Sequence, residues 1–212
     1  MKPVLIQNVT LLVGREFRKI ESANLLIRDG IIQEIDSKET ELTNAEVLDG
    51  EGLLGIPGLI DAHTHIGDSF AKDLGVGKPL RELVHPLHGI KSKLLANESP
   101  ATIREAISQT SKDMLSCGIT TFADFREGGL EGLELARQAL SKCKQRVLLL
   151  GRPSLSYSEE TVTHDEDIPE PIEEEAKKIL AVSDGVGLSG ANEYTNSSLK
   201  TIAKIARGTN KL

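Results

Sequence analysis

The chain has 212 residues, a formal net charge of −7 and few aromatic side chains: four Phe, two Tyr and no Trp. Acidic and basic residues are interspersed, so neither a basic stripe nor an aromatic platform suggests a nucleic-acid partner. No apolar run approaches the roughly 18 residues of a membrane-spanning helix, and the isolated Cys117 and Cys143 suit a reducing compartment. We expect a soluble, cytoplasmic protein with no membrane partner.

The first 57 residues have the pattern of short strands separated by turns. The β-rich runs span residues 3–13, 23–35 and 45–58. The dipeptide Asp29-Gly30 favours a type I′ hairpin turn, because both central positions of that turn need a positive φ. We therefore predict that residues 1–57 form β-structure beside the following domain and not within it.

After Gly58 the pattern changes to alternating strands and helices. Strands are predicted at residues 59–65, 119–125, 146–151 and 185–190, and helices at 99–118, 129–144, 170–183 and 196–210. Ser99 is a suitable N-cap and Gly118 a suitable C-terminal stop, whereas the stretch between the first strand and Ser99 reads as irregular. Four strand–helix units predict parallel strands, either in a doubly wound sheet or in half of a (β/α)8 barrel of roughly 250 residues.

Two histidines stand two residues apart at the end of the first predicted parallel strand. Side chains alternate across a strand, so His63 and His65 project from one face. The carboxyl end of such a strand is where ligands bind in both α/β architectures. Two imidazoles there suit a divalent metal such as zinc, while the spacing alone equally allows one histidine to fill the core and the other to cap a loop.

The sequence around this pair, "IPGLIDAHTHIGD", follows an all-β segment that ends in "VLDGEGLLGIPG". Together they resemble the amidohydrolase superfamily, most closely its cytosine deaminase-like and chlorohydrolase-like branch, with the signature at residues 57–65. The resemblance implies an α/β fold: a β-sandwich portion at 1–57, then the first four β/α units of a (β/α)8 TIM barrel at 58–212, ending before strand 5. It also implies that His63 and His65 are metal ligands.

The implied metal is most simply zinc, with iron or manganese as alternatives, and the implied reaction is hydrolysis of carbon–nitrogen bonds other than peptide bonds. A metal-activated water would attack a small-molecule substrate. Further histidines on strands 5 and 6 and a proton-shuttling aspartate on strand 8 are expected beyond residue 212. The alternative is a truncated or split, non-enzymatic fragment that acts only when complemented. Open sheet edges then predict self-association or pairing with another chain. A doubly wound nucleotide-binding protein is disfavoured, because no glycine-rich phosphate motif follows a strand.

Four further residues are candidates for substrate contacts or for orienting a metal ligand: Asp61, Asp68, Arg126 and Glu193. Asp68 could accept a ring N–H from an imidazole. Arg126 lies near Asp124 and Glu127 at the same rim and could hold an anionic substrate group or form salt bridges. Glu193 could be a ligand, a substrate contact or an exposed acid.

Some sequence features point away from a site. Residues 185–194 contain no lysine, which disfavours the lysine-bridged two-metal centre that some superfamily members have on strand 4. His85 and His88 lie in a loop-rich stretch where a lid role is the alternative to a solvated loop. His164 lies in an acidic loop and is expected to be exposed.

Overall fold

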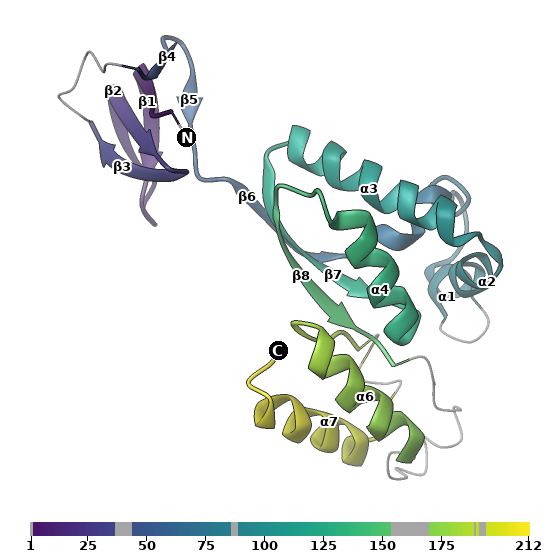
Figure 1. The fold of residues 1–212 in the computed structure, drawn as a ribbon. Helices are drawn as coiled ribbons and strands as arrows, with labels where there is room; N and C mark the ends of the chain where they lie inside the picture. Colours follow the sequence, from purple (N-terminus) through teal and green to yellow (C-terminus); the bar gives the residue numbers. More distant parts are fainter. Residues whose placement is uncertain (1, 37–43, 86–88, 154–169, 189, 191–193) are drawn as a thin grey trace. The chain divides into compact units, whose positions relative to one another are not determined.

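The computed structural model describes residues 2–36, 44–85, 89–153, 170–188, 190 and 194–212. The chain divides into two compact units, Met1–Gly58 and Leu59–Leu212 (Figure 1). None of the described helices is long and apolar enough to cross a membrane. Cys117 and Cys143 are both free thiols.

The N-terminal unit is a mixed sheet of five strands. These are β1 (Val4–Val13), β2 (Arg18–Arg28), β3 (Ile31–Ile35), β4 (Glu46–Asp49) and β5 (Leu54–Gly55), in the order β3-β2-β1-β4 with β5 also paired to β1. Asp29 and Gly30 connect β2 to β3 with φ values of 50° and 76°, as the predicted hairpin turn requires. The described residues of this unit contain no helix, and the β-sandwich assignment stays a prediction.

The second unit is built on a parallel sheet of four strands. These are β6 (Leu59–Thr64), β7 (Ile119–Arg126), β8 (Arg146–Gly151) and β9 (Gly185–Val186). Their order in the sheet, β6-β7-β8-β9, is their order in the chain, and every neighbouring pair is parallel. The four predicted strands are therefore present, although β9 is shorter than the predicted 185–190. Within the described sheet the strand order does not reverse, as it would at the switch point of a doubly wound fold.

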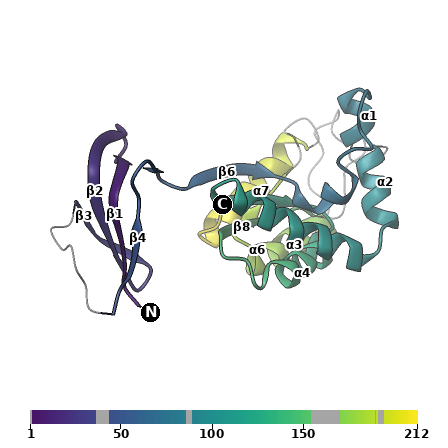
Figure 2. The same ribbon diagram turned by 90° about the horizontal axis from the view of Figure 1, so that it is seen from above.

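Helices connect these strands. They are α3 (Pro100–Ser116), α4 (Gly129–Leu140), α6 (Glu170–Val182) and α7 (Asn196–Gly208). The signals read in the sequence set the ends of α3: the Ser99 hydroxyl accepts a hydrogen bond from the Thr102 N–H at 3.1 Å, and Gly118 follows the helix with φ 83°. Helices α3 and α4 pack side by side (Figure 2).

The stretch after β6 differs from the prediction. It was expected to be irregular, but it forms a 3-10 helix, η1 (Ile66–Ala71), and two short helices, α1 (Leu80–Val84) and α2 (Ile90–Asn97). Neither α1 nor α2 has a buried residue or a side-chain cap at its N-terminus. A helix is predicted from a sequence by an amphipathic stripe and an N-terminal cap. Because α1 and α2 have neither signal, they could not be predicted.

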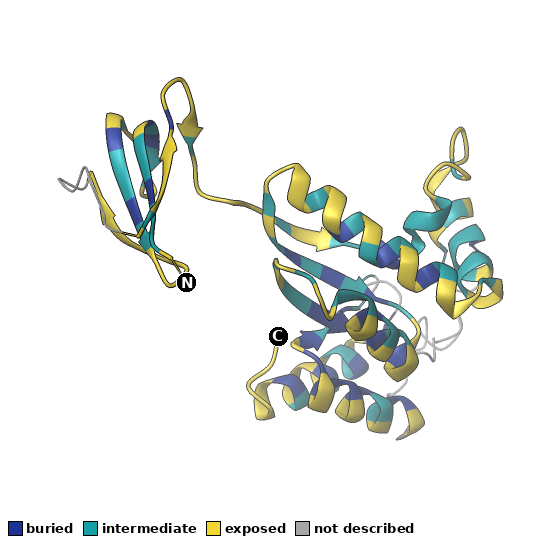
Figure 3. Cartoon of the chain, turned by 45° about the horizontal axis from the view of Figure 1, so that its top comes forward, coloured by how far each residue is buried: buried dark blue, intermediate teal, exposed yellow. Residues whose placement is uncertain are grey.

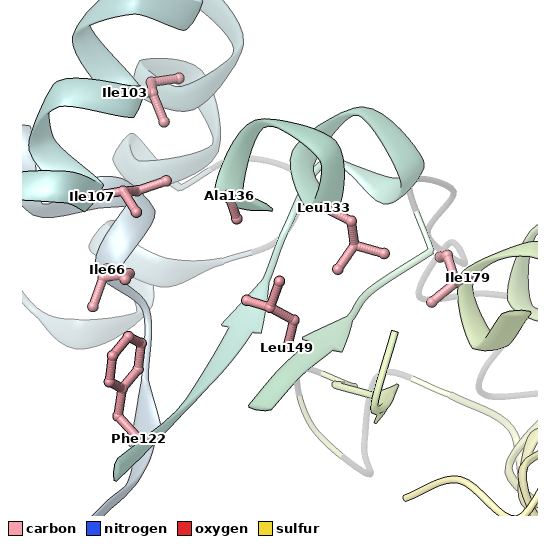
Figure 4. Close-up of a cluster of buried hydrophobic side chains, with 8 residues drawn as sticks. All are labelled: Ile66, Ile103, Ile107, Phe122, Leu133, Ala136, Leu149 and Ile179. Atoms are coloured by element: carbon pink, nitrogen blue, oxygen red, sulfur yellow. The ribbon is translucent and has the colours of Figure 1, made fainter. Parts of the chain in front are cut away.

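One hydrophobic cluster joins the helices to the sheet (Figure 4). Its buried members are Ile66, Ile103, Ile107, Phe122, Leu133, Ala136, Leu149 and Ile179, from η1, α3, β7, α4, β8 and α6. The sides of α3 and α4 that face away from the strands are exposed (Figure 3). Along the second half of β7 the burial alternates, with Phe122, Asp124 and Arg126 buried on the helix-covered face and Phe125 half-buried on the other. Two buried polar side chains, Asp124 and Arg126, therefore lie near the carboxyl end of the strand.

Candidate metal centre

The two histidines meet where β6 ends. The Nε2 atom of His63 lies 3.2 Å from the Nε2 atom of His65, and the ring centroids are 5.1 Å apart. The alternation of side chains along the strand accounts for this convergence, as predicted from the sequence. His63 is exposed and His65 is half-buried, so a small ligand can reach both rings.

The surroundings of His65 determine which of its ring nitrogens carries the proton. Its Nδ1 atom lies 2.9 Å from Glu127 Oε1 and 3.1 Å from the backbone oxygen of Phe125. Both neighbours are acceptors, so Nδ1 is the N–H donor in the neutral ring. In that tautomer the lone pair is on the Nε2 atom of His65, which lies 3.2 Å from His63 Nε2.

His63 is held differently. Its ring stacks on the ring of Phe125, with centroids 4.2 Å apart and an interplanar angle of 26°. Its backbone N–H donates to Asp61 Oδ1 at 3.2 Å, so Asp61 supports the end of β6. Of the two imidazoles, one is oriented by a carboxylate and the other by an aromatic face.

The spacing of the two nitrogens fits a shared metal ion. Two imidazole nitrogens at about 2.0–2.1 Å from a tetrahedral zinc are ~3.3 Å apart. The observed separation of the Nε2 atoms is 3.2 Å. Among the described residues, no third His, Cys, Asp or Glu completes a metal-binding group with them. The pair therefore suits two ligands of a metal site and does not by itself fill the coordination shell.

His65 contacts a network of charged side chains made of Glu127, Lys91, Arg126, Asp124 and Asp68. Besides the imidazole, Glu127 Oε1 contacts Lys91 Nζ at 2.5 Å, and Glu127 Oε2 accepts from Arg126 Nη2 at 2.6 Å. Burial acts to raise the pKa of Glu127, but the hydrogen bond from His65 and the charges of Arg126 and Lys91 outweigh it. The pKa of Glu127 therefore lies well below its ordinary value, and the carboxylate is ionised.

The partner of the imidazole is therefore Glu127, where the sequence had suggested Asp68. The Asp68 carboxylate instead pairs with Lys91, at 3.0 Å between Oδ2 and Nζ. The sequence placed Glu127 at the correct rim without assigning it a function. It gave no signal for Lys91, because α2 itself was not predicted.

Asp124 and Arg126 form the buried base of the network, with side chains 0% and 3% exposed. Asp124 Oδ1 accepts from the Ile66 N–H at 2.8 Å, which fixes the turn after His65. Burial raises the pKa of Asp124, although the charge of Arg126 opposes this shift. Arg126 Nη1 lies 3.6 Å from Asp124 Oδ2, and neither atom has a hydrogen-bond partner among the described residues.

Arg126 forms salt bridges in this structure, with Asp124 and with Glu127, and its proposed contact with a substrate stays a prediction. Its guanidinium lies so close to Gly67 that a Cβ atom there would collide with it.

The remaining candidates lie apart from this site or outside the described residues. His85 follows α1, is half-buried and joins no metal-binding group among the described residues. Glu193, His88 and His164 lie outside the described residues, so their proposed roles stay predictions.

Comparison with known proteins identifies the family. A parallel β/α unit with two imidazoles at a strand's carboxyl end is the arrangement expected of a metal-binding α/β protein. The sequence profile of the amidohydrolase family matches residues 55–212, and the chain belongs to this family.

Individual relatives agree with this assignment. A protein of Methanothermobacter thermautotrophicus, provisionally named an aminohydrolase, is 34% identical over 212 residues, which are 100% of this chain and 53% of the relative. A 5-methylthioadenosine/S-adenosylhomocysteine deaminase of Clostridium tetani is 33% identical over 129 residues, 57% of this chain and 28% of its own. The solved atrazine chlorohydrolase of Arthrobacter aurescens, complexed with zinc, has a TM-score of 0.71 at 17% identity and shares the fold over 98% of this chain and 51% of its own. The chain thus spans about half the length of the relatives that it matches throughout.

Proposed function

We propose that this protein is a metal-dependent hydrolase of carbon–nitrogen bonds other than peptide bonds, of the amidohydrolase or deaminase type. The observation that carries the proposal is the convergence of His63 Nε2 and His65 Nε2 at 3.2 Å, with Nδ1 of His65 already engaged as a donor. Membership of the amidohydrolase family supports hydrolytic chemistry. The deaminase relatives support a small-molecule substrate with a C–N bond.

We also assign residues 58–212 to the first four β/α units of a (β/α)8 barrel and residues 1–57 to a β-sandwich portion. Four parallel strands in sequential order are what the first half of such a barrel requires. The histidines then lie at the carboxyl face, where barrel enzymes have their active sites. Strands β6 and β9 are the edges of the described sheet, and pairing of another chain with these edges stays a prediction.

In the proposed site, His63 and His65 would hold a divalent metal, with zinc favoured because imidazole suits it and a structural relative contains it. Iron and manganese are the alternatives. The metal supplies Lewis-acid activation of water. The chain's own residues orient the ligands: Glu127 holds the His65 ring, and Phe125 covers one face of the His63 ring.

A second candidate function follows from the small number of ligands. A catalytic zinc usually has three protein ligands, and the described residues offer no third beside His63 and His65. This favours, as the alternative, a non-enzymatic fragment that becomes active only when another polypeptide supplies the remaining ligands. Turnover by the purified chain without a partner would exclude this alternative.

Metal analysis tests the main proposal. The protein is saturated with zinc, desalted and assayed for bound metal, alongside the double variant His63→Ala/His65→Ala and the control His85→Ala. The double variant should lose most of the bound zinc, whereas His85→Ala should retain it, because His85 lies outside any described metal-binding group. Equal zinc contents in the wild type and the double variant, with both folded by circular dichroism, would refute the ligand assignment.

A further inference from the structure

We propose that Glu127 is a positioning residue of the metal centre: it locks His65 in the tautomer that presents Nε2 to a metal. The expected effect of Glu127 on metal affinity rests on the proposed function. The structural part of the proposal concerns only the orientation and the tautomer of one imidazole and can be measured without metal.

The geometry around His65 carries the proposal. Glu127 Oε1 lies 2.9 Å from Nδ1, closer than the 3.1 Å of the Phe125 carbonyl oxygen, and the carboxylate adds a charge that the carbonyl lacks. A charge-assisted hydrogen bond is shorter and about twice as strong as a neutral one. The carboxylate is therefore the dominant partner of the Nδ1–H group, and it makes the opposite nitrogen a better metal ligand.

The carboxylate itself is held in place from two further sides. Its other oxygen accepts from Arg126 Nη2 at 2.6 Å, and Lys91 Nζ contacts Oε1 at 2.5 Å. Arg126 is enclosed beside Asp124, and the absence of a side chain at Gly67 gives its guanidinium room. These contacts keep Glu127 from rotating away from His65.

His63 provides the internal contrast. Among the described residues, the His63 ring stacks on Phe125 and contacts His65, and neither contact involves a carboxylate. If the metal centre forms, the two ligands are therefore unequal: a carboxylate orients His65, whereas His63 is held by stacking on the Phe125 ring. Loss of Glu127 should affect His65 selectively and leave His63 stacked.

The test uses Glu127→Ala and Glu127→Gln, with Glu131→Gln as the control. Glu131 is an exposed acid in the first turn of α4, so its neutralisation changes the net charge equally without touching an imidazole. Ring nitrogen chemical shifts of His65 are recorded in the metal-free protein, and zinc affinity is measured by competition with a chelator. Circular dichroism verifies the fold of each variant.

In the wild type, the shifts should show a proton on Nδ1 of His65. Glu127→Ala should give a mixture of tautomers and bind zinc about 10–100-fold more weakly. Glu127→Gln keeps an acceptor oxygen and should fall in between, so it decides the matter if the alanine variant does not fold. Glu131→Gln should match the wild type.

The outcomes separate the two proposals. Unchanged His65 shifts and a zinc affinity within about twofold of the wild type in both Glu127 variants would overturn the positioning role and leave the proposed function standing. A wild type that binds no zinc would instead overturn the proposed function, while the ring shifts would still show whether Glu127 orients His65.

Discussion

The two faces of strand β7 differ in burial and in the side chains that they contact. On the helix-covered face, Phe122 lies in the hydrophobic cluster and is followed by Asp124 and Arg126, all of them buried. On the other face, Phe125 is half-buried and carries the stacked ring of His63. The covered face contributes to the hydrophobic cluster, and the opposite face positions the ring of His63. The strand's carboxyl end connects them, because Glu127 bonds to both Arg126 and His65.

Because the two faces differ in this way, we expect stability and metal binding to respond separately to substitutions on them. Burial of apolar area dominates on the covered face, where a deleted ring leaves a cavity. On the opposite face Phe125 is only half-buried, so its loss should change the orientation of His63 more than it changes stability. The following substitutions test this separation.

The largest effect is expected from Phe122→Ala on the covered face. Phe122 is 0% exposed and is a central member of the hydrophobic cluster, so its truncation should lower the free energy of unfolding by about 3–5 kcal/mol. Denaturant unfolding measures this change. Leu74→Ala is the control, because Leu74 is 58% exposed and its truncation should cost less than about 0.5 kcal/mol. Equal losses in both variants would show that the cluster is not the core.

An intermediate effect is expected from Gly67→Ala, at the junction of the two faces. The added methyl group would displace the Arg126 guanidinium from its enclosed position and weaken its pairing with Glu127, at a cost of about 1–3 kcal/mol in unfolding free energy. Gly208→Ala is the matched control, since nothing lies within 4 Å of its added Cβ. That variant should be neutral or slightly stabilised, and a similar destabilisation at both positions would contradict the argument.

The smallest effect is expected from Phe125→Leu on the opposite face. Loss of the stacking on His63 should remove about 1 kcal/mol of the energy that orients this ring. Zinc affinity should then be roughly fivefold weaker, with little change in the free energy of unfolding. Phe70→Leu makes the same change in a half-buried ring packed against the hydrophobic cluster. It should lower stability and leave zinc affinity unchanged. If the two variants exchanged these effects, the assignment of the two faces would be wrong.

Local signals in the sequence predicted much of this fold. The hairpin at Asp29-Gly30, the Ser99 cap and the four parallel strands were each predicted from a few neighbouring residues, and the structure confirms them. The convergence of His63 and His65 was equally accessible, because the period of a strand is a local property.

The parts that escaped prediction depend on contacts between distant segments. Arg126 is buried close to Gly67, and Lys91 of α2 contacts both Asp68 and Glu127, so these contacts join segments that are far apart in the chain. Neither set of contacts has a local sequence signal. The short helices α1 and α2 escaped for the same reason, since they lack both buried residues and N-terminal side-chain caps.

The pairing of β6 with β7 also has a kinetic consequence. The acceptors that orient His65 are 60 and 62 residues further along the chain, so a long crossover must close before the imidazole is fixed. Contacts of such sequence separation form late compared with local helices. If the proposed metal site forms, zinc binding during refolding should therefore lag behind the appearance of helical signal. The time at which zinc binds would then report when β6 and β7 pair.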